Sequence, residues 1–200
     1  MQVLREYIQQ FILEDRAWKR AGLQFDPLAP LKKWAGKGTF VHFASINKLG
    51  INPQFQYVHP FGIHAYPFTS DLLDKIINNS IPFAGHREYI HVFKPVLPSL
   101  VITKENFSED DYEYYVGMLK DMGHQIPEMS SQEPAIDRFM KLTKQLSGGN
   151  NYVQWGLLFR KLGIEGLVDQ KRNLAVFFGK DTIKQLDTVM NPHFSKEEDY

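Results

Sequence analysis

Histidine is the residue type in this sequence with the most versatile chemistry near neutral pH, because its ring binds both protons and metals there. Four of the seven histidines follow one another in one stretch of the chain: His59, His64, His86 and His91. No two of them have the i, i+4 spacing with which a helix presents a pair of zinc ligands. Zinc would need three of them to converge from separate strands, so the sequence does not favour a metal site.

Other common catalytic patterns are also missing from the sequence. There is no cysteine, which excludes thiolate nucleophiles, disulfides and cysteine-ligated zinc. There is no G-x-S-x-G motif, and the glycine-containing loop at 147–151 lacks the Lys and Ser/Thr of a P-loop. The acidic cluster at 109–113 is expected to be the solvated start of a helix. Nothing specific therefore indicates a hydrolase or a P-loop nucleotide triphosphatase.

The composition is that of a globular protein of the cell interior. The 200 residues fit one domain, and 43% of them are hydrophobic. Lys and Arg together number 23, as do Asp and Glu, so no global field attracts nucleic acid or anionic lipid. No apolar run reaches the roughly 20 residues of a membrane span, and no secretion signal is recognisable. We therefore expect no membrane partner and a cytoplasmic location.

The pattern of apolar residues predicts an α+β fold. Clusters of apolar and β-branched residues between turn signals predict strands at 39–44, 62–66, 89–94, 99–103, 166–168, 174–178 and 183–189. Helices are predicted at 70–78, from Ser108 to Gly123, from Pro134 onwards and at 151–163. Ser108 and Asp111 form a capping-box pattern at the start of the second helix, and Pro134 suits the first turn of the third. Strands and helices do not alternate regularly, so we expect a mostly antiparallel sheet.

The ends of the chain differ in character from its middle. Apolar residues at spacings of three and four predict an amphipathic helix at 1–14, which either packs on the domain or is detachable. Residues 15–38 are expected to be a connector, irregular from 22 onwards because of its prolines and glycines. The main domain is then expected at 39–190, followed by an acidic tail at 191–200.

Three stretches of the sequence resemble the signature segments of the ADP-ribosyltransferase fold. They are F-V-H-F-A-S at 40–45, F-G-I-H-A-Y-P-F at 61–68, and R-K-L-G-I-E-G-L-V-D at 160–169 followed by N-L-A-V-F-F at 173–178. Their order and separation are nearest to the poly(ADP-ribose) polymerase-like branch found in tailed-phage proteins. The resemblance covers residues 39–189 and implies a split, mostly antiparallel sheet with NAD⁺ as substrate.

The resemblance also assigns roles to individual residues. His42 matches the histidine that hydrogen-bonds the adenosine ribose of NAD⁺. His64 stands where the family has the tyrosine that stacks on nicotinamide, and Tyr66 follows it on the same face of the strand. Asn173 stands where the family has its glutamate. The implied catalytic set is His42, His64 and Asn173, and we expect the three side chains to converge on one cleft.

Two further residues belong to the implied NAD⁺ site, and one substitution weakens its chemistry. Ser45 and Gly62 lie in the signature segments and complete the implied cofactor contacts with His42, His64 and Tyr66. An asparagine at position 173 supplies no negative charge to an oxocarbenium-like transition state, which by analogy costs about 10²–10³ in rate. The alternatives are that Glu165 or Asp169 replaces the glutamate, or that the protein is catalytically silent.

The N-terminal segment resembles the capsid-targeting peptides of large tailed phages. In that group a head-maturation protease cuts after Leu/Ile-x-Glu, and residues 12–14 read I-L-E; residues 126–128 satisfy the same short pattern. The resemblance implies capsid or other virion proteins as partners, and a location in the virion interior and then in the host cytoplasm. A host protein or nucleic acid would be the acceptor of ADP-ribose. The alternative function is a silent structural or internal head protein that keeps the fold.

Overall fold

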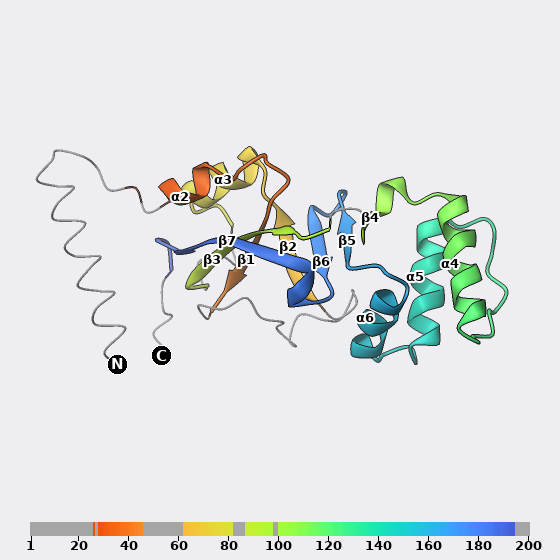
Figure 1. Ribbon diagram of the computed structural model, residues 1–200. Coiled ribbons are helices and arrows are strands. Elements are labelled where there is room, and N and C mark those ends of the chain that lie inside the picture. Colours follow the sequence, from red (N-terminus) through yellow and green to blue (C-terminus); the bar gives the residue numbers. More distant parts are fainter. Residues whose placement is uncertain (1–25, 27, 46–61, 82–86, 98–99, 195–200) are drawn as a thin grey trace, which may run out of the picture.

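The computed structural model describes residues 26, 28–45, 62–81, 87–97 and 100–194 (Figure 1). Within these residues the strands are β1 (Phe40–Ala44), β2 (Ile63–Pro67), β3 (Tyr89–Pro95), β4 (Val101–Thr103), β5 (Gly166–Asp169), β6 (Leu174–Phe177) and β7 (Ile183–Met190). The α-helices are α2 (Ala29–Lys32), α3 (Ser70–Ile77), α4 (Glu109–Asp121), α5 (Ala135–Leu146) and α6 (Tyr152–Lys161). Two short 3₁₀ helices are η4 (Lys104–Asn106) and η5 (Lys180–Thr182).

The seven strands form one sheet in the order β4-β5-β6-β2-β1-β3-β7. Neighbouring strands are antiparallel except β4 and β5, which are parallel. The α+β class is confirmed, but the sheet is mixed. The reason is the connection from β4 to β5, which contains α4, α5 and α6 and is long enough to return the chain to the same end of the sheet.

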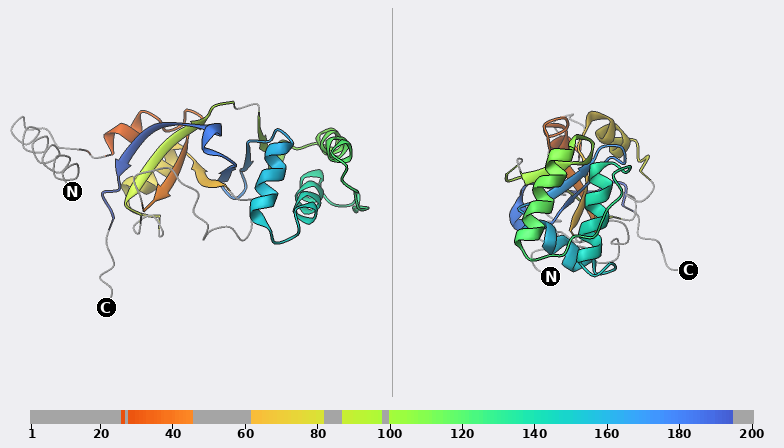
Figure 2. Two further views of the ribbon diagram at one scale, coloured as in Figure 1. Left: turned by 60° about the horizontal axis from the view of Figure 1, so that its bottom comes forward. Right: turned by 90° about the vertical axis from the view of Figure 1, so that its right-hand side faces the viewer.

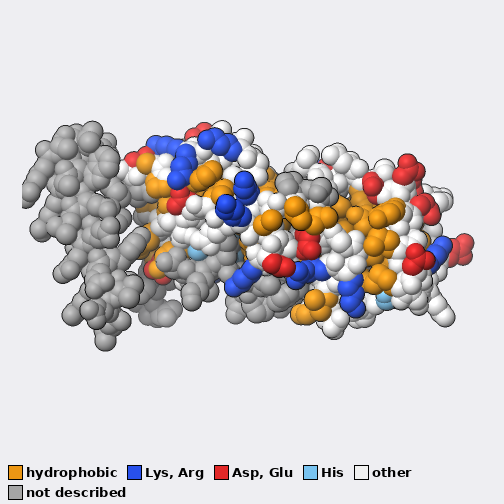
Figure 3. All heavy atoms as spheres, in the orientation of Figure 1, with side chains coloured by type: hydrophobic (Ala, Val, Ile, Leu, Met, Phe, Trp, Pro, Cys, Tyr) orange, Lys and Arg blue, Asp and Glu red, His pale blue; other side chains and the backbone are white. Residues whose placement is uncertain are grey.

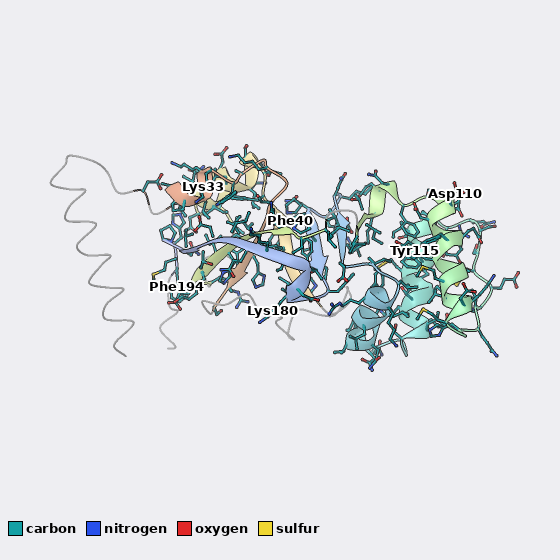
Figure 4. All side chains as sticks on the ribbon, in the orientation of Figure 1. Lys33, Phe40, Asp110, Tyr115, Lys180 and Phe194 are labelled. Carbon is teal, nitrogen blue, oxygen red and sulfur yellow. The ribbon has the colours of Figure 1, made fainter. Side chains whose placement is uncertain are left out.

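Helix starts follow the chemistry of their capping residues. The predicted capping box of α4 is confirmed, because the Ser108 hydroxyl accepts a hydrogen bond from the Asp111 N–H while the Asp111 carboxylate accepts one from the Ser108 N–H. Asn151 caps α6 by accepting a hydrogen bond from the Gln154 N–H. Pro134 occupies the N-cap position of α5, one residue before the first turn in which it was expected. The acidic start of α4 faces solvent as predicted (Figures 3 and 4).

The segment predicted as an irregular connector contains helix α2. Its Leu31 is completely buried and the preceding Leu28 nearly so, in a cluster with residues of β1, β3 and α3. Pro30 lies in the first turn of α2, where its missing N–H is tolerated. Two leucines three residues apart therefore outweigh the turn signals of the surrounding prolines and glycines. The predicted helix at 1–14 lies outside the described residues, as does the predicted tail from residue 195 onwards.

The sheet is curled. We call the face that turns in on itself, which carries Phe40, Phe93 and Phe177, the inner face. Strands β6 and β3 are separated by β2 and β1, which in a flat sheet would place them about 14 Å apart. Yet the rings of Phe177 on β6 and Phe93 on β3 are 5.3 Å apart, and Phe177 also contacts Phe40 on β1 at 4.9 Å. These phenylalanines form the centre of a core made by strands alone.

Helices cover the outer face of the sheet in two groups. Helices α2 and α3 pack on one end, against Val41 and Phe43 of β1 and their neighbours on β3. Helices α4, α5 and α6 form a separate group at the other end (Figures 1 and 2). That group shares a core with the sheet through Leu167, Val176 and Phe178. The residues predicted to bind NAD⁺ lie on β1 and β2 or next to them, and β1 is covered by the first group.

Candidate functional site

His42 lies on the inner face of β1 with its ring fixed by the backbone of the neighbouring strand. Its Nδ1 atom is 2.7 Å from the carbonyl oxygen of His64 on β2. A carbonyl oxygen only accepts hydrogen bonds, so Nδ1 carries the proton and donates it. In the neutral ring the other nitrogen, Nε2, is then an acceptor. No described residue forms a hydrogen bond to that Nε2 atom.

The ring of His42 belongs to a row of three aromatic side chains. His42 is directly opposite His91 of β3, with ring centroids 6.2 Å apart and ring planes at 20°. The ring of Tyr89, two residues before His91, is 6.4 Å from it on the other side. His91 is completely buried, and its Nδ1 atom is 2.9 Å from the Thr188 hydroxyl of β7. The row thus forms a polar continuation of the phenylalanine core on the inner face.

A cation lies beside this row where β1 ends and β3 begins. The Arg87 guanidinium donates a hydrogen bond of 2.9 Å to the hydroxyl of Ser45, the residue that follows β1. The backbone carbonyl of Arg87 accepts a hydrogen bond of 2.9 Å from the Asn191 side chain, which positions this residue. The Arg87 charge acts on His42, since it contributes to the pKa of that ring.

The surroundings of His42 favour its neutral form. Burial lowers the pKa of the His42 ring below its ordinary value of 6.5, because a charged ring loses solvation. The hydrogen bond to the His64 carbonyl opposes this effect, whereas the charges of His91 and Arg87 lower the pKa further. The result is a ring that keeps a fixed donor and a fixed acceptor at neutral pH.

The side chains of His64 and Tyr66 lie on the other face of the sheet. Tyr66 is directly opposite Val41, and its ring contacts that of Phe43 at 6.0 Å, so it faces the α2 and α3 side. His64, two residues earlier on the same strand, has the same orientation. Only the backbone of His64 reaches His42. The expected convergence of both rings on one cleft is therefore wrong, because alternation along β1 and β2 assigns them to opposite faces.

Asn173 occupies the turn between β5 and β6 rather than a strand. Its φ of 50° is in the left-handed region, and its N–H donates to the Gln170 carbonyl at 3.1 Å. Asparagine tolerates this conformation better than most residues, which accounts for its presence here. The side chain is exposed, and β2 and β6 lie between this turn and β1 in the sheet order. The structure does not bring Asn173 into contact with His42.

The two carboxylates considered as replacements for glutamate are held by cations. Asp169 is buried and forms an ion pair of 3.1 Å with Lys104. Burial alone would raise its pKa, but the Arg172 N–H and the Lys104 ammonium outweigh that effect and lower it. Glu165 pairs with Arg160 at 3.4 Å. Each carboxylate is paired with a cation within the fold, and neither contacts His42.

Gly62 has a structural reason for lacking a side chain. A Cβ atom at this position would be 2.5 Å from the Phe177 carbonyl oxygen and 2.7 Å from Cγ1 of Val176. The close approach of β6 therefore requires glycine at position 62 whether or not a ligand binds there.

Sequence reasoning did not assign to the NAD⁺ site three residues that the structure places around His42, namely Arg87, His91 and Thr188. The alternation along the predicted strand at 89–94 places His91 on the same face as Phe93, but no local signal pairs it with His42. That pairing depends on the register of β1 against β3. Arg87 lies just before the strand and Thr188 on β7, so both join the site through long-range pairing alone.

Comparison with known proteins finds no matching family model, no matching curated protein and no matching solved structure. Among the described residues, no three His, Asp or Glu side chains are grouped so that they could hold a metal ion. No helix in the same part of the chain is long and apolar enough to cross a bilayer.

Proposed function

We propose that this chain is an ADP-ribosyltransferase-like protein that binds NAD⁺ at the inner face of its sheet, with the adenosine ribose at His42. The observation that carries the proposal is the fixed ring of His42, whose Nδ1 proton is held by the His64 carbonyl. Its Nε2 atom is thereby available to accept a hydrogen bond from a ribose hydroxyl. The Arg87 guanidinium and the Ser45 hydroxyl supply a cation and a polar group for the pyrophosphate.

Transfer of ADP-ribose to a host protein or nucleic acid is the second part of the proposal, and we infer that it is slow or absent. Loss of nicotinamide leaves a cationic sugar that a nearby carboxylate would stabilise. Asn173 lies in an exposed turn, and the carboxylates of Asp169 and Glu165 are paired with cations. These observations favour the alternative of a silent protein that keeps the fold and the binding of NAD⁺.

Thermal unfolding with and without NAD⁺ tests the binding site. A ligand that binds only the folded state raises the melting temperature, so NAD⁺ is expected to stabilise the wild-type protein. The same shift is expected to disappear in His42→Ala and to persist in His124→Ala, a change in the distant helical group. Comparing shifts rather than melting temperatures removes any direct effect of the substitutions on stability. No shift in the wild type, or an equal shift in His42→Ala, would contradict the proposal.

A labelled-NAD⁺ assay separates transfer from binding. The protein is incubated with label and host lysate, and transferred label and released nicotinamide are measured. We expect little of either from the wild type and no gain from Asn173→Glu, because this exposed turn does not reach His42; Asn173→Gly is the control that suits the positive φ at this turn. Rapid transfer by the wild type that persists in Asn173→Gly would show that the protein is not silent.

A virion origin is proposed on the N-terminal sequence alone, because residues 1–14 lie outside the described part of the chain. If the segment is a capsid-targeting peptide, processing after Glu14 leaves Asp15 as the first residue in mature particles. Mass spectrometry of purified virions identifies the N-terminus directly. A chain that starts at Met1, or the absence of the protein from virions, would rule out this assignment.

A further inference from the structure

A cavity of about 430 Å³ lies at the junction of the sheet and the helical group. Its walls come from η4, the turn between β5 and β6, and the first turn of α5, which lie along the same edge of the molecule (Figure 1). This volume is within the range of small-molecule sites in proteins. Of the residues considered for the NAD⁺ site, only Asp169, a possible replacement for the glutamate, lines the cavity, and it lies away from His42; the ligand of the cavity is therefore a separate question.

Two acidic residues of the cavity already have partners. The Glu105 carboxylate accepts hydrogen bonds from the Gln170 N–H at 3.2 Å and the Lys171 N–H at 3.0 Å. The Asp169 carboxylate accepts one from the Arg172 N–H at 3.0 Å and pairs with Lys104. Both acids therefore hold the β5–β6 turn against η4; Lys104 balances the charge of Asp169, whereas Glu105 is held by backbone N–H groups.

The basic side chains of the turn are less well compensated. Lys171 has no ion-pair partner among the described residues. The Arg172 guanidinium is 3.8 Å from the Asp169 carboxylate, which Lys104 already pairs with at 3.1 Å. The Arg172 side chain is 59% exposed. Asp137 is the third acidic residue of the lining and belongs to the first turn of α5. The turn side of the cavity thus offers two cationic donors for an anion.

Part of the cavity lining is apolar. It includes Phe107, Pro134 and Ile136. The Phe107 ring is held by stacking on Phe139, with centroids 5.1 Å apart and planes at 22°. A lining that contains both apolar residues and two cations is suited to a ligand that joins an apolar body to a charged oxygen group.

We propose that this cavity binds a small ligand in which a phosphate or a carboxylate is attached to an apolar body. Lys171 and Arg172 bind the oxyanion, and Phe107, Pro134 and Ile136 contact the body. Hydrogen bonds between charged groups contribute enough that loss of both cations reduces affinity roughly tenfold or more. This site is independent of the NAD⁺ site at His42.

Titration of the labelled full-length protein with phenyl phosphate and with benzoate, followed by amide chemical shifts, tests the proposal. We expect saturable shifts at Lys171, Arg172 and Phe107 with one or both probes, and the responding probe identifies the oxyanion. Benzyl alcohol, which lacks the charge, is expected to bind much more weakly. Absence of saturable shifts with both anionic probes, or equal binding of the alcohol, would overturn the proposal.

Three variants complete the experiment. The double variant Lys171→Gln, Arg172→Gln changes exposed side chains and is expected to weaken binding at least tenfold. Lys120→Gln, an exposed lysine at the end of α4, and His42→Ala are both expected to bind the probe as the wild type does. Unchanged binding in the double variant would overturn the proposal. Loss of probe binding in His42→Ala, or competition by NAD⁺, would show that the cavity is not a separate site.

Discussion

His42 illustrates how one backbone contact defines the chemistry of a side chain. Its Nδ1 proton is donated to the His64 carbonyl, so the tautomer and the orientation of the ring are both determined by the pairing of β1 with β2. Burial then keeps the ring neutral by lowering its pKa. A neutral ring with a fixed acceptor recognises a hydroxyl group without binding a proton first.

This lowered pKa predicts a specific dependence of stability on pH. The unfolded chain, in which the His42 pKa is near 6.5, binds a proton before the folded protein does as the pH falls. The free energy of unfolding should therefore decrease as the pH falls below about 6.5, and His42→Gln should reduce that decrease. Urea unfolding at pH 7.5 and pH 5 measures the difference. An equal decrease in both proteins would contradict the assignment.

Two glycines provide a matched pair for testing the close approach of β6. Gly62→Ala places a Cβ atom against the Phe177 backbone, and we expect a loss of about 1–3 kcal/mol in the free energy of unfolding. Gly117→Ala on α4 meets nothing within 4 Å and improves helix propensity, so we expect a gain of about 0.5–1 kcal/mol. Chemical denaturation measures both changes. A tolerated Gly62→Ala would instead indicate that glycine is not required by packing.

At the level of elements, the start of helix α4 is set by the capping box that Ser108 and Asp111 form. Ser108→Ala removes the acceptor for the Asp111 N–H, and we expect a loss of about 1 kcal/mol. Ser131→Ala changes an exposed serine outside any helix and serves as the control, with an expected effect within about 0.5 kcal/mol. Equilibrium unfolding followed by circular dichroism distinguishes the two. Equal effects would mean that the cap does not stabilise α4.

Some residues of the turn between β5 and β6 stabilise the turn itself, and others line the cavity. Its left-handed Asn173 and the hydrogen bonds from its backbone to Glu105 account for the turn as a structural feature. The same turn presents Lys171 and Arg172 to the cavity, which the fold itself does not require. The structural role of Asn173 weakens its assignment as a catalytic residue. Lys171 and Arg172 are instead the residues of the turn that indicate ligand binding.

For the molecule as a whole, the curl of the sheet depends on three phenylalanine rings. Phe177 is completely buried and contacts both Phe40 and Phe93, which lie on strands that are not its neighbours. Phe177→Ala should cost about 3–5 kcal/mol and loosen the inner face, including the row of rings around His42. Tyr114→Ala, at a side chain that is 64% exposed, should change stability by less than about 0.5 kcal/mol. Thermal and chemical unfolding of both variants measure these effects, and similar losses would contradict the role of Phe177.

The local sequence pattern was sufficient to predict the helices and strands, but it was not sufficient to predict how the site residues are arranged. All seven strands and the four longer helices correspond to predicted segments, because apolar periodicity and capping residues act over a few positions. The α2 helix escaped prediction because burial of Leu28 and Leu31, which local pattern does not report, stabilises it.

The arrangement of the candidate residues required the long-range pairing of strands. The register of β1 against β3 places His42 beside His91, and alternation along β2 turns the His64 side chain away from both. The curl of the sheet and the crossover from β4 to β5 are set by packing between residues far apart in sequence. The pattern of a single strand contains no information on its register against other strands. A resemblance in three short segments could therefore identify His42, His64 and Asn173 as candidates, but it could not predict whether they lie close together.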